Sequence, residues 1–163
     1  MNHIAADQTY PRTKQEAMLD IKHAVLVHRL NERFFNRLDA VLGGIGMAGG
    51  SAAVVGLLGG STNIAAVAGA ILATLSIIER TVVAARKAEI HRQGAETFAA
   101  LEVRAQSLQL EEIDAELAST KVRFPDGLEG MGWVAYNRNL RSAGLLSSVV
   151  PMNRWQRLLD ACV

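Results

Sequence analysis

Hydrophobic and polar positions alternate with helical spacing near the beginning of the chain. Val27, Leu30, Phe34 and Leu38 recur at intervals of three or four residues, and no Gly or Pro interrupts residues 14–38. Positions with this spacing lie on one face of an α-helix. The pattern therefore predicts an amphipathic helix over 14–38, with charged residues on its other sides.

This alternation stops at residue 39, and residues 40–78 form a run of 39 positions without Asp, Glu, Lys or Arg. As a helix, 40–58 is ~28 Å long, which is about the thickness of the hydrocarbon core of a bilayer. Gly59, Gly60, Ser61, Thr62 and Asn63 then predict a turn. We expect two transmembrane helices, 40–58 and 61–80, that form a hairpin. The alternative is a buried hairpin inside a soluble bundle, which the length of the uncharged run disfavours.

Small residues recur at four-residue intervals in both expected spans. Such spacing weakens a helix in water, whereas in lipid it lets helix backbones approach closely. We therefore expect a homo-oligomer whose helices pack along the glycines. A hydroxyl in a span could face a lumen or, as is more common, bond its own helix backbone. The candidate packing and pore residues are Gly46, Gly50, Gly56, Gly69, Ser51 and Thr74.

Basic residues flank the hairpin on both sides, and the connecting turn carries no charge. The flanking residues are Arg33, Arg37, Arg80, Arg86 and Lys87. Because Lys and Arg collect on the cytoplasmic side of a membrane protein, this arrangement predicts that both termini lie in the cytoplasm.

Residues 81–163 form the expected cytoplasmic helical region. One long helix is predicted from 81 to about 120, and its apolar stripe shifts position where it reaches Ile113 and Leu117. Pro125, Asp126 and Gly127 end it. A helix over 128–142 follows, and a short last helix is expected to begin at Pro151. The whole chain, 1–163, is then a single all-α domain.

The chain offers little catalytic chemistry. Its net charge of +1 gives no reason to expect nucleic-acid binding. Residues 44–49 match the dinucleotide pattern G-x-G-x-x-G, but neither a preceding strand nor an acidic residue about 20 positions on accompanies them. The four histidines are scattered, and a lone Cys162 makes no internal disulfide. We expect no enzyme, no cofactor and no metal, and a surface or packing role for each histidine.

Residues 85–101, with the sequence ARKAEIHRQGAETFAAL, follow the second span. Together with the order of amphipathic helix and Gly-rich spans, this segment resembles the SLATT domains of bacterial conflict systems. In that family a His is followed by an aromatic residue and then a Leu, and His91, Phe98 and Leu101 fit this pattern. SLATT domains are two-transmembrane modules proposed to perturb membranes on signals from nucleotide second messengers or sensor proteins.

The resemblance implies a membrane effector of the bacterial inner membrane that acts in antiviral defence, with no catalytic residues. Its partners would be the lipid bilayer, further copies of the chain, and a nucleotide second messenger or a separate sensor protein. Two alternatives remain open. In one, the hairpin anchors a scaffold or a phage virion or ejection component; in the other, a soluble helical bundle hides the hairpin and inserts it on demand.

Overall fold

The computed structural model describes residues 12–142 and 144–163, and throughout these residues it contains helices and no strands. The all-helical prediction is thus confirmed for this part of the chain. The elements are α1 (Lys14–Leu58), α2 (Thr62–Val82), α3 (Ala84–Ala105), α4 (Leu110–Arg123), α5 (Met131–Ser142), a 3-10 turn η1 (Leu146–Ser148) and α6 (Arg154–Cys162).

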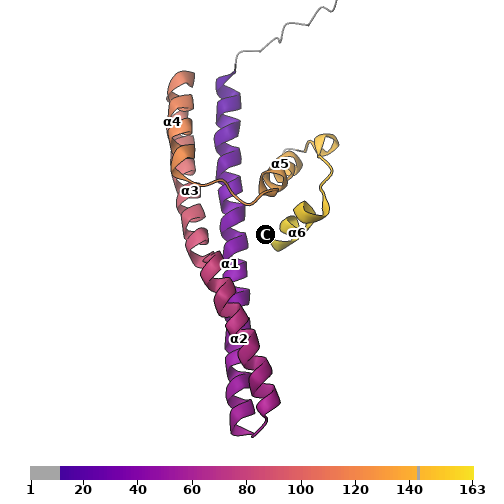
Figure 1. Cartoon of the computed structure of the whole chain (residues 1–163). Helices are drawn as coiled ribbons and strands as arrows, with labels where there is room; N and C mark the ends of the chain where they lie inside the picture. Colours follow the sequence, from indigo (N-terminus) through magenta and orange to yellow (C-terminus); the bar gives the residue numbers. More distant parts are fainter. Residues whose placement is uncertain (1–11, 143) are drawn as a thin grey trace, which may run out of the picture.

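Helix α1 is one uninterrupted rod that joins the amphipathic segment to the first uncharged segment (Figure 1). Thr13 caps its N-terminus, because the Thr13 hydroxyl accepts from the Glu16 amide at 3.2 Å and the Glu16 carboxylate accepts from the Thr13 amide at 2.7 Å. Its 45 residues correspond to a length of ~67 Å. The segments 14–38 and 40–58 are therefore parts of one helix.

Residues 40–58 of α1 and helix α2 form a two-helix hairpin, which projects away from the rest of the molecule (Figure 1). The connecting turn includes Gly60 at φ 71°, a left-handed conformation that glycine adopts without strain. The Ser61 amide donates to the Gly56 carbonyl at 2.8 Å and closes the end of α1.

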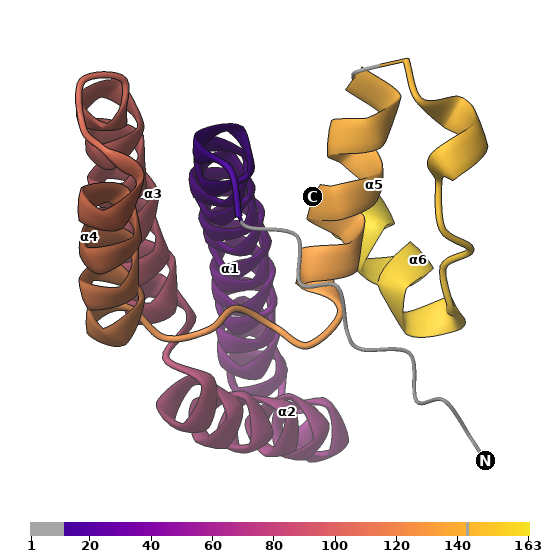
Figure 2. The same ribbon diagram turned by 90° about the horizontal axis from the view of Figure 1, so that it is seen from above.

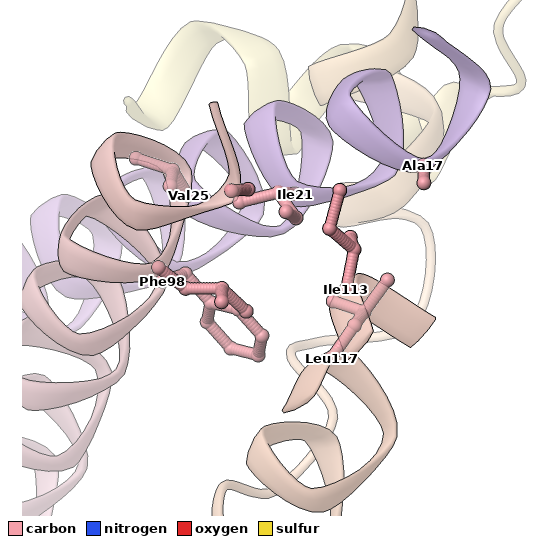
Figure 3. Close-up of a cluster of buried hydrophobic side chains, with 8 residues drawn as sticks. Ala17, Ile21, Val25, Phe98, Ile113 and Leu117 are labelled. Carbon is pink, nitrogen blue, oxygen red and sulfur yellow. The ribbon is translucent and has the colours of Figure 1, made fainter. Parts of the chain in front are cut away.

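The other end of the molecule is organised around residues 14–38 of α1. Together with α3, α4, α5 and α6, this part of α1 is here called the head. Helices α3 and α4 lie on one side of α1, and α5 and α6 lie on the other (Figure 2). Between α1, α3 and α4 is a buried apolar cluster, which Figure 3 shows. Its members are Ala17, Ile21, Val25, Phe98, Leu101, Ala105, Ile113 and Leu117.

The predicted long helix over 81–120 is wrong, because the chain breaks at residues 106–109 and α4 turns back against α1 and α3. The break is stabilised locally, since the Glu112 carboxylate accepts from the Gln109 amide at 2.8 Å. Lys14 also donates to the carbonyls of Gln106 and Leu108, at 2.9 and 2.7 Å. These bonds satisfy backbone groups that a helix end leaves free.

A second apolar cluster, which includes Leu30 and Leu159, attaches α5 and α6 to α1. The buried Asn31 side chain reinforces this attachment, because its Oδ1 accepts from the Leu128 amide at 2.8 Å, while its Nδ2 donates to Val27 O at 2.8 Å within α1. Helix α5 begins three residues later than predicted. Helix α6 begins at Arg154 and not at Pro151, since Asn153 caps it.

The junction between α2 and α3 is a single residue, Val83. Its φ of 46° is left-handed, and it is the sole non-glycine residue with positive φ in the described part of the chain. This conformation is costly for a β-branched side chain. Helix α1 passes Val83 without any break. The two connections between head and hairpin therefore differ: one is a continuous helix, and the other contains a break.

Candidate functional site

The hairpin has an apolar surface that the rest of the chain leaves uncovered. Two helical stretches in the structure are long and apolar enough to cross a membrane, by length and composition. Only 11% and 12% of their most apolar segments are buried within the chain. A core helix of a soluble protein would be mostly covered, so this single chain does not hide its hairpin as a soluble bundle would.

Large apolar side chains are exposed along both helices of the hairpin. Leu58, for example, is 86% exposed and Met47 is 73% exposed. Exposed apolar surface of this extent marks a membrane or protein contact site. The residues involved are Val41, Ile45, Met47, Val54, Val55, Leu57, Leu58, Ile64, Val67, Ile71, Ile77 and Ile78.

The candidate glycines divide into two groups by their surroundings. At Gly56 an added Cβ would lie 2.8 Å from the backbone N of Ala65, so this glycine permits close contact between α1 and α2. At Gly46, Gly50 and Gly69 an added Cβ would meet nothing within 4 Å. Their expected packing role therefore concerns contacts between copies and stays a prediction. At Gly49, which the sequence analysis did not single out as a packing residue, an added Cβ would lie 3.3 Å from the Leu72 side chain.

The two candidate hydroxyls bond to their own helices. Ser51 donates to Met47 O at 2.9 Å, and Thr74 donates to Ala70 O at 2.9 Å. This is the more common of the two arrangements considered from the sequence. Neither hydroxyl needs a lumen to satisfy its donor.

The basic flank gathers at the level where the hairpin meets the head. Phe35 of α1 packs against Ala84 and Ala88 of α3, which sets these two helix segments side by side. Lys87 places its ammonium 5.5 Å from the centre of the Phe35 ring. Exposed cationic residues from both helices at this level are Arg33, Arg37, Arg86 and Lys87. The side chain of Arg80 lies outside the described part of the structure.

A buried histidine pair in the head is a feature that sequence reasoning missed. His28 of α1 and His91 of α3 are 6% and 4% exposed, and their Nδ1 atoms are 3.0 Å apart. The expected surface or simple packing role is thus incomplete for these two histidines. Their contact joins positions 63 residues apart, and no local spacing encodes it.

Aromatic rings and a glycine enclose this pair. His28 stacks on Phe98 with ring centres 5.2 Å apart, and His91 lies parallel to Phe35 with ring centres 5.7 Å apart. Gly94 lets the His28 ring approach the α3 backbone, because a Cβ there would lie 2.6 Å from His28 Nδ1. Glycine is therefore required at this position by the close approach of a side chain.

The enclosure favours neutral rings. Burial lowers the pKa of His28, and the nearby Asp126 opposes that effect. Burial, the neighbouring His28 and Lys87 together lower the pKa of His91 to about 4. At neutral pH one Nδ1–H donates to the other ring's Nδ1 lone pair.

A cavity of about 360 Å³ adjoins the pair between α1, α4 and the connection to α5. His23, His28, Lys121, Phe124 and Asp126 contribute to its walls. The cavity thus combines aromatic surface with charges of both signs, and it gives His28 a route to solvent.

Comparison of the chain with protein-family models, with curated proteins and with solved structures found no match. The resemblance to SLATT domains therefore rests on the residues quoted above and on the order of the elements.

Proposed function

We propose that this protein is a non-enzymatic membrane effector whose hairpin crosses the bacterial inner membrane, with both termini in the cytoplasm. One observation carries the proposal: the 39 uncharged residues coincide with the projecting, uncovered hairpin. In water, that surface would be exposed at a cost of roughly 25 cal/mol per Å² of apolar area. A bilayer removes this cost and needs no partner protein to do so.

The depth of the hairpin suits a bilayer. Residues 40–58 of α1 give ~28 Å, and residues 62–78 of α2 give ~26 Å before Glu79. The exposed Asp39 and Glu79 are the nearest charges on either side, and the exposed cations of the basic flank follow. This succession of apolar and basic surface is typical of a helix end at the cytoplasmic headgroup layer.

We further propose that several copies associate through their hairpins and permeabilise the membrane when triggered. Two helices cannot enclose a water path, and Gly46 and Gly50 of α1, with Gly69 of α2, offer surfaces free of internal contacts. The trigger implied by the resemblance is a nucleotide second messenger or a separate sensor protein. The effector acts in antiviral defence in this interpretation.

The main alternative is an anchor, in which the hairpin holds the head at the membrane for a scaffold or phage component. The hydroxyl bonds of Ser51 and Thr74 favour it, because an anchor requires no polar lining. A soluble precursor form would need some further surface to cover the hairpin.

Insertion is tested by expressing the chain in bacteria and washing the membranes with alkaline carbonate. Retention in the membrane pellet is the expected result, and release into the wash would refute insertion. Cross-linking in mild detergent then tests assembly, for which a strictly monomeric protein at every concentration would be the contrary outcome.

Effector and anchor are separated by the variant Gly46→Leu with Gly50→Leu, which leaves the internal contact at Gly56 intact. Leu still spans lipid but keeps neighbouring backbones apart. With a parent that depolarises cells, an effector loses this activity in the variant at equal membrane abundance. Equal depolarisation by the two would show that the glycines are not a packing surface. The matched control, Val54→Leu, should behave like the parent.

A further inference from the structure

The contact between His28 and His91 joins the two head helices that lead directly into the hairpin. His28 precedes the first uncharged residue, Ala40, by 12 positions, and His91 follows Glu79 by 12 positions. His28 is thus ~18 Å along α1 from Ala40, whereas the α2–α3 junction at Val83 separates His91 from the uncharged run. Any loss of this contact therefore acts on α1, which continues into the hairpin, and on α3, which is joined to α2 at Val83.

We propose that the His28–His91 pair is a proton-sensitive contact that holds α1 against α3 and is lost when both rings are protonated. The proposal rests on the membrane function above for its physiological meaning. Its chemical basis lies in the pair itself.

The contact tolerates one added proton and excludes a second. In the neutral pair one Nδ1 donates and the other accepts across 3.0 Å. One further proton leaves a donor on one Nδ1 and a lone pair on the other. When both rings are imidazolium, two N–H groups and two positive charges face each other, so no hydrogen bond can form and the charges repel.

The surroundings determine the order of protonation. Asp126, in the connection after α4, faces His28 and favours its charged form, whereas Lys87 on α3 disfavours charge on His91. His23 on α1 and Lys121 on α4 are the other titratable groups at the adjoining cavity. Stacking on Phe98 and Phe35 compensates part of the charge. We therefore expect His28 to take up the first proton and His91 the second.

The rings have little room to separate while the helices stay packed. His28 lies directly on the α3 backbone at Gly94, and His91 is parallel to Phe35 of α1. Loss of the pair therefore loosens the α1–α3 packing.

The direction of the pH effect follows from the depressed pKa values. The folded pKa values lie below the ordinary 6.5, so the packed state is fully stabilised above pH 6.5 and loses this stabilisation as the pH falls towards about 4. Each proton bound more by the open state changes the open-to-packed ratio by up to about ten-fold per pH unit.

The test measures the α1–α3 distance in the full-length protein. Spin labels are attached at Arg29→Cys and Gln93→Cys in a Cys162→Ser background, and pulsed electron resonance is recorded in detergent and in lipid nanodiscs from pH 7.5 down to about 4, the pKa of His91. The proposal expects a reversible shift towards longer distances below pH 6.5. An unchanged distance distribution would overturn it.

Two variants test the assignment independently, in case one of them folds poorly. His28→Gln and His91→Gln each leave a side chain that takes no proton in this range, and each should abolish the shift. The matched control His23→Gln removes a cavity histidine outside the pair and should keep it. A shift that persists in both pair variants, or that disappears in the control, would refute the assignment.

Imidazole NMR of the wild-type protein provides a measurement that needs no variant. His91 must titrate below His28, and titration of both rings near pH 6.5 would contradict the proposal. All of these measurements work in detergent. Failure of membrane insertion in cells would therefore overturn the proposed function and leave the result on the histidine contact intact.

Discussion

The two halves of α1 present opposite surfaces although they belong to one helix. In residues 14–38 the apolar side chains Ile21, Leu30 and Phe35 are buried, and charged side chains cover the outside. In residues 40–58 Leu42 is buried, but most of the large apolar side chains are exposed and charges are absent. The helical backbone of α1 continues without a break across this change of surface.

This comparison shows that backbone geometry and environment are encoded separately. Helical propensity and capping account for the continuous rod, whereas the distribution of charge specifies which solvent each half requires. The head folds by burying its apolar side chains within the chain. The hairpin, in our proposal, buries them in lipid.

The largest effect is expected when charged residues are introduced into the hairpin, which makes its surface resemble that of the head. Val54→Lys together with Ala70→Lys should abolish carbonate-resistant membrane retention, because each Lys near a span centre costs ~2.5–3.5 kcal/mol of insertion free energy. The control Val103→Lys introduces the same charge on an exposed head position and should leave retention unchanged. Full retention of the double variant would show that the hairpin does not span the bilayer.

Truncating apolar side chains should separate the two regions next most strongly. Phe98→Ala in the head core should lower the free energy of unfolding in detergent by about 3–5 kcal/mol. Leu57→Ala, at a hairpin side chain that is 70% exposed, should change it by under about 0.5 kcal/mol. Chemical denaturation followed by circular dichroism compares the two. Similar losses in both variants would mean that the hairpin has an internal core.

Glycine-to-alanine changes should have opposite signs in the two regions. Gly94→Ala should destabilise the head by about 1–3 kcal/mol, because the new Cβ would overlap the His28 ring. Gly50→Ala meets nothing within 4 Å and should stabilise by up to about 1 kcal/mol through helix propensity. Thermal melts of each variant in the same detergent provide the comparison. A stabilising Gly94→Ala would disprove the close approach of His28 to α3.

The smallest effect is expected at the boundary between the regions. Val83→Gly should stabilise the protein by about 1 kcal/mol, because glycine adopts the left-handed conformation without a steric penalty. Its neighbour provides the control: Val82→Gly, inside α2, should destabilise the protein, because it lowers helix propensity and removes a side chain packed against the Phe35 cluster. If both substitutions destabilise equally in thermal melts, Val83 does not have a left-handed backbone.

Helical content, the hairpin turn and the exposure pattern were accessible from the sequence because they depend on local spacing and on one long absence of charge. The break at residues 106–109 was only hinted at by the shifted apolar stripe at Ile113 and Leu117. Part of its stabilisation comes from Lys14, which lies more than 90 residues away in the chain.

The histidine pair was inaccessible for a related reason. Which residue of α1 faces His91 is determined by how α1 and α3 pack, and therefore by contacts such as that of Phe35 with Ala84 and Ala88. The four histidines are scattered along the sequence, and the relevant neighbour of His28 lies on another helix. The role of Gly94 also becomes visible only with the ring placed against it.

The junction at Val83 makes the two connections between head and hairpin mechanically unequal. A change in the direction of α3 can be absorbed by backbone rotation at one residue, so α2 need not follow. Helix α1 has no such break. A rotation of residues 14–38 about the helix axis is therefore transmitted to residues 40–58. One residue corresponds to ~100° of azimuth in an α-helix, and Gly46 and Gly50 lie four positions apart on one face. Torsion of α1 in the head would therefore re-aim the glycine face relative to neighbouring hairpins, without any change in how deeply α1 lies in the bilayer.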